Sequence, residues 1–278
     1  MATDNGHVSV SDDPVSPMLE ACSSGDISTL QRLFADHGIQ PGSEPIYPKF
    51  VDPSGNPQEV SSTSVTESQQ IPPTTELLER AVAAKQVVIV RFILQNYPSL
   101  SLMQLHGVVR AVLENPDPAV LQALCDHESS FASFSVDYGM RSFLTDACAR
   151  PPEEIVPVLH VLLDNGADVD DGWGPGGGAL YAAIVGGQPL EIVRKILGKS
   201  VAVSSRNINT AVGQGRADVV KLLLNQEQID PGVNVEEVVE GAQKSGNQEI
   251  IATVKTWTRS KRPKENLLQK AKRLIKKG

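Results

Sequence analysis

Apolar residues recur at helical spacing along most of the chain, and the segment 155–170 shows the pattern most clearly. Four of its apolar residues share one helix face: Val158, Leu159, Leu162 and Leu163. Asn165-Gly166 follow, and glycine ends helices because it readily adopts the left-handed backbone conformation. The next residues, Ala-Asp-Val-Asp, form a short extended turn. The pattern therefore predicts an amphipathic helix with one buried face, followed by a turn.

Three segments resemble the ankyrin repeat family. The motif Leu-Leu-x-x-Gly-Ala-Asp-Val-Asp at 162–170 is similar to the second half of an ankyrin repeat. The segment at 16–22 is similar to the opening Thr-Pro-Leu-His-x-Ala-Ala, with Ser16 placed to cap a helix and Pro17 in its first turn. The segment 211–224 carries the rest of the resemblance. The resemblance implies helix-turn-helix repeats stacked into an all-α ankyrin-repeat solenoid.

The same register recurs seven times. A small residue stands where two first helices approach closely: Ala21, Ala81, Ala111, Ala147, Ala183, Ala211 and Ala242. The residue three positions earlier is apolar: Met18, Leu78, Val108, Leu144, Leu180, Ile208 and Val239. The second helices place one apolar row at Leu30, Val90, Leu121, Leu159, Val193, Val220 and Ile251, and another at Leu33, Ile93, Leu124, Leu162, Ile196, Leu223 and Val254. From Ala81 on, successive alanines are separated by 30, 36, 36, 28 and 31 residues, close to the ankyrin period of about 33. We predict about seven irregular repeats over 16–256.

The chain departs from the family pattern at two positions. The family's histidine is replaced by Leu19, Glu79, Val109, Thr145, Tyr181, Asn209 and Glu240. The glycine that ends the first helix is kept as Gly25, Gly187, Gly215 and Gly246, but it is missing from repeats two to four.

Two segments outside this register are expected to be irregular. Residues 1–15 are polar and are expected to be disordered. The insertion 40–73 contains seven prolines and six serines without helical periodicity, so we expect a disordered, solvated loop. A linear partner motif at 46–50, Ile-Tyr-Pro-Lys-Phe, is the alternative, and the serines are candidate phosphorylation sites.

A glycine-rich segment, 171–178, stands between repeats four and five. It is not a nucleotide loop, because no Gly-Lys-Ser/Thr follows the glycines and no strand precedes them. Trp173 lies in this segment, and it either packs back on the repeats or contacts a partner.

The net charge of −8 is distributed unevenly. From Lys255 onward there are ten Lys/Arg and one acid, whereas the rest of the chain carries 15 basic and 32 acidic residues. Residues 257–278 predict a basic amphipathic tail, in which Leu267, Leu268, Ala271, Leu274 and Ile275 share one face. Its lysines and arginines resemble nuclear-import clusters, and the candidates for binding an import receptor are Lys261, Arg262, Lys264, Lys272 and Arg273. A solvated end cap and a membrane-surface or calmodulin-binding helix are the alternatives.

The sequence contains no pattern typical of an active site, cofactor site or metal site. The five histidines lack metal-ligand spacing, and no nucleophile or kinase motif is present. Cys22 and Cys148 follow buried alanines, where a thiol packs as a small apolar group. We therefore expect neither catalysis nor a cofactor. The absence of a basic stripe on the repeats argues against sequence-specific nucleic-acid binding. No apolar run is long enough to span a membrane.

The resemblance implies a protein-protein interaction module that binds partners with the first helices and the turns beside them. The residues before each alanine, here named the pre-alanine row, are the predicted contacts: Glu20, Arg80, Arg110, Asp146, Ala182, Thr210 and Gly241. The charged members lie in repeats one to four, and ordinary solvated charges are the alternative explanation. A nuclear transcription co-regulator is the favoured role, with a cytoplasmic scaffold or adaptor next and an enzyme of unknown type last. We expect a nuclear or cytoplasmic rather than a secreted protein, because the N-terminus lacks signal-peptide features.

Overall fold

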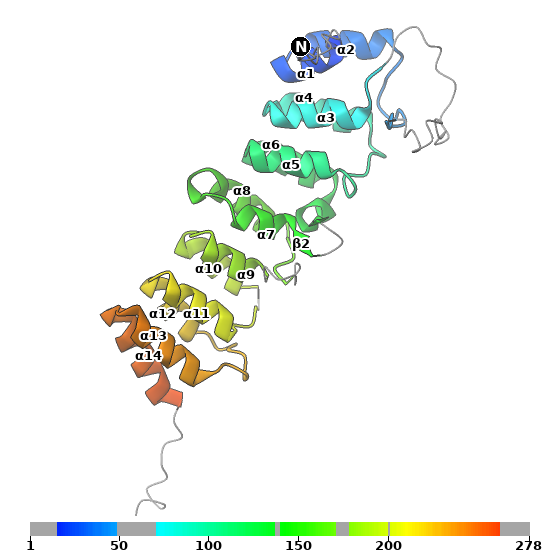
Figure 1. The fold of residues 1–278 in the computed structure, drawn as a ribbon. Helices are drawn as coiled ribbons and strands as arrows, with labels where there is room; N and C mark the ends of the chain where they lie inside the picture. The colour runs from blue at the N-terminus through cyan, green and yellow to red at the C-terminus, as the bar shows by residue number, and fades with distance from the viewer. Residues whose placement is uncertain (1–15, 49–70, 137–139, 171–177, 200, 262–278) are drawn as a thin grey trace, which may run out of the picture. The chain divides into compact units, whose positions relative to one another are not determined.

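The computed structural model describes residues 16–48, 71–136, 140–170, 178–199 and 201–261. The chain divides into two compact units, an N-terminal unit of residues 1–131 and a C-terminal unit of residues 132–278. Both are built from antiparallel helix pairs that follow one another along the chain (Figure 1).

Three helix pairs are described in the N-terminal unit. Their bounds are α1 Pro17–Ser24, α2 Ile27–Asp36, α3 Thr74–Ala83, α4 Val87–Asn96, α5 His106–Glu114 and α6 Pro118–His127. The first helix of each pair packs against the first helix of the next, α1 on α3 and α3 on α5. The second helices α4 and α6 also contact each other. The short 3₁₀ helix η1, Ser129–Ser133, crosses the boundary between the two units.

The described residues of the C-terminal unit form a small hairpin and four helix pairs. Their bounds are β1 Ser135–Val136, β2 Arg141–Ser142, α7 Phe143–Cys148, α8 Pro152–Asp164, α9 Ala179–Val185, α10 Leu190–Leu197, α11 Ser205–Gly213, α12 Ala217–Leu224, α13 Val235–Ser245 and α14 Gln248–Lys261. The two strands are antiparallel, with Val136 opposite Arg141. First helices again contact first helices, from α7 through α9 and α11 to α13. The hairpin was not predicted, because two-residue strands carry no measurable periodicity.

Some helices begin with a side chain that accepts hydrogen bonds from free backbone amides, but Ser16, the predicted cap of α1, makes no side-chain cap hydrogen bond. Asp117 accepts hydrogen bonds from the amides of Ala119 and Val120 at the start of α6. The predicted glycines Gly25, Gly187, Gly215 and Gly246 all have positive φ, between 66° and 77°. In repeat two the same place is taken by Lys85, the one described non-glycine residue with positive φ, at 58°. A lysine there stores backbone strain that glycine would avoid.

The predicted apolar rows form the cores of both units. All seven alanines are at most 8% exposed. The residues three positions before them are buried in six repeats and partly exposed only at Val239. The second-helix rows are buried except at Leu33 in the first repeat and Ile251 in the last. The register that the sequence predicts is therefore the register of the fold.

The described ends of the insertion are held to the second helix pair. The amide of Ile46 donates to the hydroxyl of Thr74 (2.9 Å), and the Ile46 carbonyl accepts from the Thr74 amide (2.7 Å). The amide of Gly42 donates to the carbonyl of Asn96 at 3.1 Å. Pro45 is buried. This part of the segment that was predicted to be a disordered loop therefore packs against the second helix pair. Residues 1–15 and 49–70 lie outside the described residues, and their predicted disorder stays a prediction.

Candidate functional site

The pre-alanine row lies on the solvent-exposed side of the first helices. Glu20, Arg80 and Arg110 are exposed, on α1, α3 and α5. The remaining members are partly exposed, and they lie on α7, α9, α11 and α13: Asp146, Ala182, Thr210 and Gly241. The row is thus accessible in every repeat, while the alanine that follows each member is buried.

In the N-terminal unit the row carries two arginines on adjacent helices. Arg80 and Arg110 make no ion pair within 4.0 Å with any other described residue. Glu79 lies beside Arg80 in sequence, and its carboxylate occupies the space that a side chain at Gly107 would need. Burial raises the pKa of Glu79, while the nearby Arg110 guanidinium lowers it and Glu76 raises it. The two arginines are therefore cationic groups available to a ligand.

In the C-terminal unit, neighbouring first helices are joined by polar contacts on the same side. The Arg206 guanidinium of α11 lies 4.0 Å from the ring centroid of Tyr181 on α9. One repeat later, the Asn209 amide of α11 donates to the Glu237 carboxylate of α13 at 2.8 Å. Tyr181 and Asn209 stand two positions before their alanines, and Arg206 and Glu237 stand five positions before theirs. The second position before one alanine thus contacts the fifth position before the next.

On the solvent-exposed side of the first helices in the C-terminal unit, residues at different positions before the alanine have different roles. In these two contacts, residues two and five positions before the alanine join neighbouring repeats. From repeat five onward, the pre-alanine row beside them consists of small residues: Ala182, Thr210 and Gly241. These contacts were not predicted from the sequence, and the signal that marks them is the polar or aromatic residue in place of the family's histidine.

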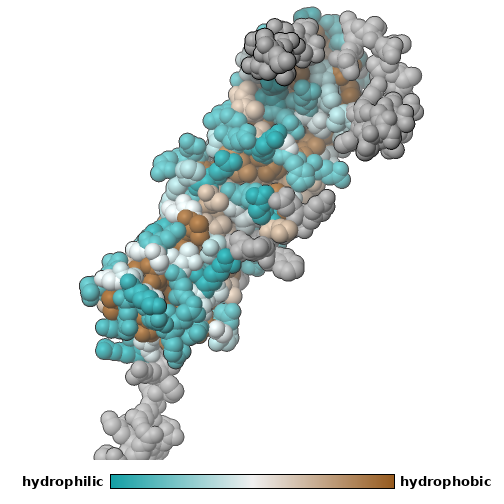
Figure 2. All heavy atoms as spheres, viewed as in Figure 1, coloured by the Kyte–Doolittle hydropathy of each residue, from teal (hydrophilic) through white to brown (hydrophobic). Residues whose placement is uncertain are grey.

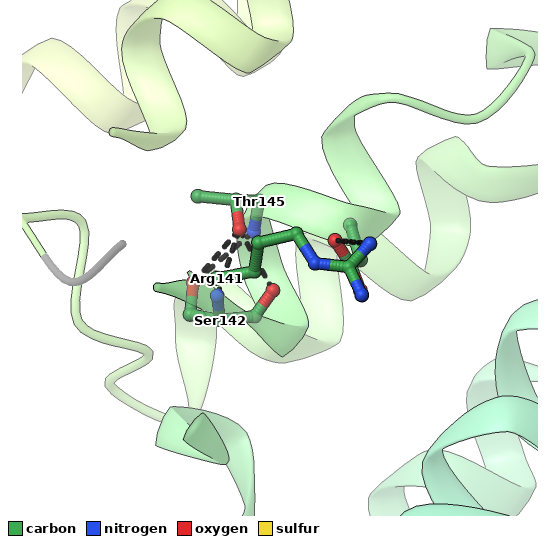
Figure 3. A network of polar contacts seen from close by, with 4 residues as sticks. Arg141, Ser142 and Thr145 are labelled. Carbon is green, nitrogen blue, oxygen red and sulfur yellow. Dashed lines mark hydrogen bonds and ion pairs between the residues drawn. The ribbon is translucent and has the colours of Figure 1, made fainter. Parts of the chain in front are cut away.

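The start of α7 is fixed by a capping box (Figure 3). The Ser142 amide donates to the Thr145 hydroxyl at 2.8 Å, and the Thr145 amide donates to the Ser142 hydroxyl at 3.2 Å. Arg141 in β2 pairs with Asp146, with 3.4 Å between guanidinium and carboxylate. Thr145 stands in place of the family's histidine, and it provides a cap in this repeat. Asp146, a predicted partner contact, is therefore already paired within the chain.

A second set of contacts joins repeats through the turns between helices. Buried Gln188 donates from its amide to the carbonyls of Cys148 (2.9 Å) and Arg150 (2.7 Å), at the end of α7. Arg216 donates to the Gln188 carbonyl at 3.0 Å. Gln214 reaches the Val185 carbonyl at 3.1 Å. These bonds satisfy carbonyls at helix ends and hold successive first helices at a fixed spacing.

The cysteines are suited to packing. Burial raises the pKa of Cys22 and of Cys148 to about 12, and that of Cys125 to about 11. At neutral pH these thiols are protonated and hence weak nucleophiles. Within the described ranges, no group of three or more His, Cys, Asp or Glu residues is arranged to hold a metal ion. No described helix is long and apolar enough to cross a membrane.

Several predicted site residues cannot be placed on this surface. Trp173, Arg262, Lys264, Lys272 and Arg273 lie outside the described residues, as does the side chain of Lys261. On the face shown in Figure 2, hydrophilic side chains prevail and hydrophobic ones form small separate areas. The large apolar residues that are clearly exposed in the described part are Tyr47, Val88, Met140 and Val185. Tyr47, at 49% exposure, belongs to the alternative partner motif at 46–50.

Comparison with known proteins identifies the fold. No family model and no curated protein matches the chain. Among solved structures, the ankyrin repeat domain of Bcl-3, described as a unique member of the IkappaB protein family, matches with a TM-score of 0.56 and 19% identity. That match covers 88% of this chain and 100% of the Bcl-3 domain. The human ASB11 ankyrin repeat domain matches with a TM-score of 0.37 and 18% identity, over 87% of this chain and 83% of that domain. The Bcl-3 match confirms the predicted fold: the chain is an all-α repeat solenoid with the ankyrin-repeat fold.

Proposed function

We propose that the chain is a non-catalytic protein-protein interaction module that binds its partner through the pre-alanine row. The observation that carries this proposal is the arrangement on the first helices. The row is accessible in every repeat, and Arg80 and Arg110 have no ion-pair partner among the described residues. Arginine is enriched at binding hot spots because its planar guanidinium forms several directed hydrogen bonds.

The mechanism is preorganisation. Polar contacts between repeats, such as those of Gln188 and Tyr181, fix the first helices before any partner arrives. A partner that docks on such a surface costs little backbone entropy in the module. The row of the N-terminal unit carries charges of both signs, Glu20 and the two arginines, which favours a partner with complementary charges of both signs.

We further propose that the partner is a nuclear factor and that the protein is a transcription co-regulator. Support comes from the basic residues of the tail, which are candidates for an import receptor: Lys261, Arg262, Lys264, Lys272 and Arg273. A cytoplasmic scaffold is the alternative. Changing these five residues to alanine should move a fluorescent fusion out of the nucleus and leave helical circular dichroism unchanged. A wild-type fusion that is excluded from the nucleus would favour the scaffold.

Affinity capture with matched variants tests the interaction surface. Arg80→Glu/Arg110→Glu should lose the proteins that the wild-type chain retains, because the charge reversal repels groups that paired with the arginines. Arg91→Glu is the control, since Arg91 is an exposed arginine on the second helix α4 of the same repeat as Arg80. Capture that is equal for all three proteins would contradict the proposed surface. A small molecule that co-purifies without any protein would favour an enzyme.

A further inference from the structure

Three charged side chains of the pre-alanine row lie on consecutive first helices of the N-terminal unit. Glu20, Arg80 and Arg110 are exposed on α1, α3 and α5, and α3 packs against both of the other helices (Figure 1). The charges along the row are therefore negative, positive and positive. None of the three side chains forms an ion pair within 4.0 Å with another described residue. The row thus presents these charges to a partner in a fixed order.

The two arginines are placed to act on one group. Arg80 and Arg110 each stand directly before a buried alanine, at equivalent positions of neighbouring helices. The alanines let the helices approach closely, and the axes of packed helices are about 8–10 Å apart. Two long side chains that extend from such helices can both contact a group that lies between them. Guanidinium groups bind phosphate and carboxylate through paired, charge-assisted hydrogen bonds. The pair therefore fits an anionic group with several acceptor oxygens.

A carboxylate of the chain itself already lies between the same two helices. The Glu79 side chain of α3 fills the space above Gly107 of α5, three residues before Arg110 on that helix. Burial raises the pKa of Glu79 and the Arg110 guanidinium lowers it, so the two charges interact. No ion pair within 4.0 Å joins them. Glu79 therefore leaves the hydrogen-bond donors of Arg110 free, although its charge weakens the attraction of Arg110 for a second anion.

A doubly charged anion suits the arginine pair better than a single carboxylate does. Two guanidinium groups on neighbouring helices repel each other, and a dianion between them offsets both charges. A phosphate monoester carries nearly two negative charges at neutral pH and has three acceptor oxygens. A carboxylate supplies one charge and two oxygens. Clusters of arginines are accordingly a recurrent means of recognising phosphorylated segments.

We propose that Arg80 and Arg110 together bind the phosphate group of a phosphorylated segment of the partner protein. This inference rests on the proposed function, because it names the chemistry of the partner at the same surface. Glu20 on α1 then pairs with a basic residue of the same segment. The helix spacing places α1 about 12–15 Å from a phosphate between α3 and α5. An extended segment spans that distance in about four residues.

The first test uses the full chain and inorganic phosphate as the probe. The side-chain Nε–H signals of Arg80, Arg110 and Arg91 are followed by ¹⁵N NMR, with each signal assigned from a single lysine substitution. Phosphate should shift the Arg80 and Arg110 signals along one binding curve and leave Arg91, exposed on α4, unchanged. Acetate at the same ionic strength should bind at least about threefold more weakly. Equal affinities for the two anions, or different curves for Arg80 and Arg110, would overturn the proposal.

Matched variants separate the arginine pair from the general charge of the chain. Arg110→Gln should weaken phosphate binding at Arg80 about three- to tenfold, because one of two charge-assisted contacts is lost. Arg91→Gln changes the net charge equally and should alter the affinity by less than about 1.5-fold. Glu79→Gln should tighten binding about twofold, because it removes the negative charge that acts on Arg110. An equal effect of Arg110→Gln and Arg91→Gln would show that the two arginines do not act together, and would refute the clamp.

The closing experiment separates this inference from the proposed function. Affinity capture with the wild-type chain and with Arg80→Glu/Arg110→Glu is repeated on an extract treated with phosphatase. Proteins that only the wild-type chain retains should be lost after this treatment. Retention that survives phosphatase but not the double substitution would overturn the phosphate and leave the proposed surface standing. Equal retention by the double variant would contradict the proposed surface itself.

Discussion

Gln188 offers the sharpest test of how the repeats are coupled. Its side chain is fully buried in the turn between α9 and α10, and its amide nitrogen bonds two carbonyls at the end of α7. The neighbouring Gly186 lies so close to the Cys148 carbonyl that an added Cβ would be 2.0 Å from that oxygen. No water-sized space is expected there, so Gln188→Ala leaves both carbonyls without this donor.

The magnitude follows from those two lost bonds. A buried polar group left without its partner costs about 1–3 kcal/mol. The Gln188 side-chain oxygen is itself buried and has no hydrogen-bond partner among the described residues, so its removal offsets part of the loss. We expect Gln188→Ala to lower the free energy of unfolding by about 2–4 kcal/mol.

Urea denaturation followed by circular dichroism measures this loss. Gln214→Ala is the matched control, because exposed Gln214 also donates to a carbonyl of the preceding repeat, that of Val185, at 3.1 Å. Water replaces that bond, and the expected loss is below about 1 kcal/mol. If Gln188→Ala were no more destabilising than Gln214→Ala, the buried bonds would not couple the repeats.

Four further perturbations follow from the structure. Leu223→Ala should cost about 2–5 kcal/mol in the same assay, because Leu223 is fully buried, and an unchanged midpoint would contradict the register. Lys85→Gly should stabilise by about 0.5–1 kcal/mol, because it relieves the positive-φ strain, and a lower stability would show that the lysine makes a compensating contact. Burial raises the pKa of Glu79, so its charge opposes folding at neutral pH. Glu79→Gln should therefore raise the melting temperature at pH 7, and the gain should vanish as the pH falls below the carboxyl's unfolded pKa, whereas a pH-independent difference would exclude this cause. Replacement of 49–70 by a short Gly/Ser linker should preserve the melting temperature, but an extension of that replacement back to residue 42 should lower it, because Ile46 then loses Thr74.

The helices could be predicted from the sequence because every repeat buries apolar residues at the same positions. A small residue is needed where first helices meet, and Ala147, Ala183 and Ala211 are each fully buried. The glycines that end first helices could be predicted for a different reason: the helix end needs a positive φ, which glycine adopts most readily. Lys85 was not foreseen, because a lysine in that conformation leaves no mark in composition or periodicity.

The polar contacts between repeats could be predicted only in part. The loss of the family's histidine is visible in the sequence, at Tyr181 and Asn209 for example. Their partners Arg206 and Glu237 lie 25 and 28 residues later, and loops of unequal length hide that relation. The pre-alanine row was predicted because it is fixed by the alanine next to it. Its binding role stays a prediction.

The central claim is that the first-helix face binds a protein partner, and a titration of that partner tests it most directly. The partner recovered by capture is titrated calorimetrically against the wild-type chain, Arg80→Glu/Arg110→Glu and Arg91→Glu. We predict that the double substitution raises Kd by at least about tenfold, because each arginine loses a charged contact. Arg91→Glu should change Kd by less than about twofold, because α4 lies outside the binding face. An unchanged Kd for the double variant, or an equal loss with Arg91→Glu, would contradict the claim.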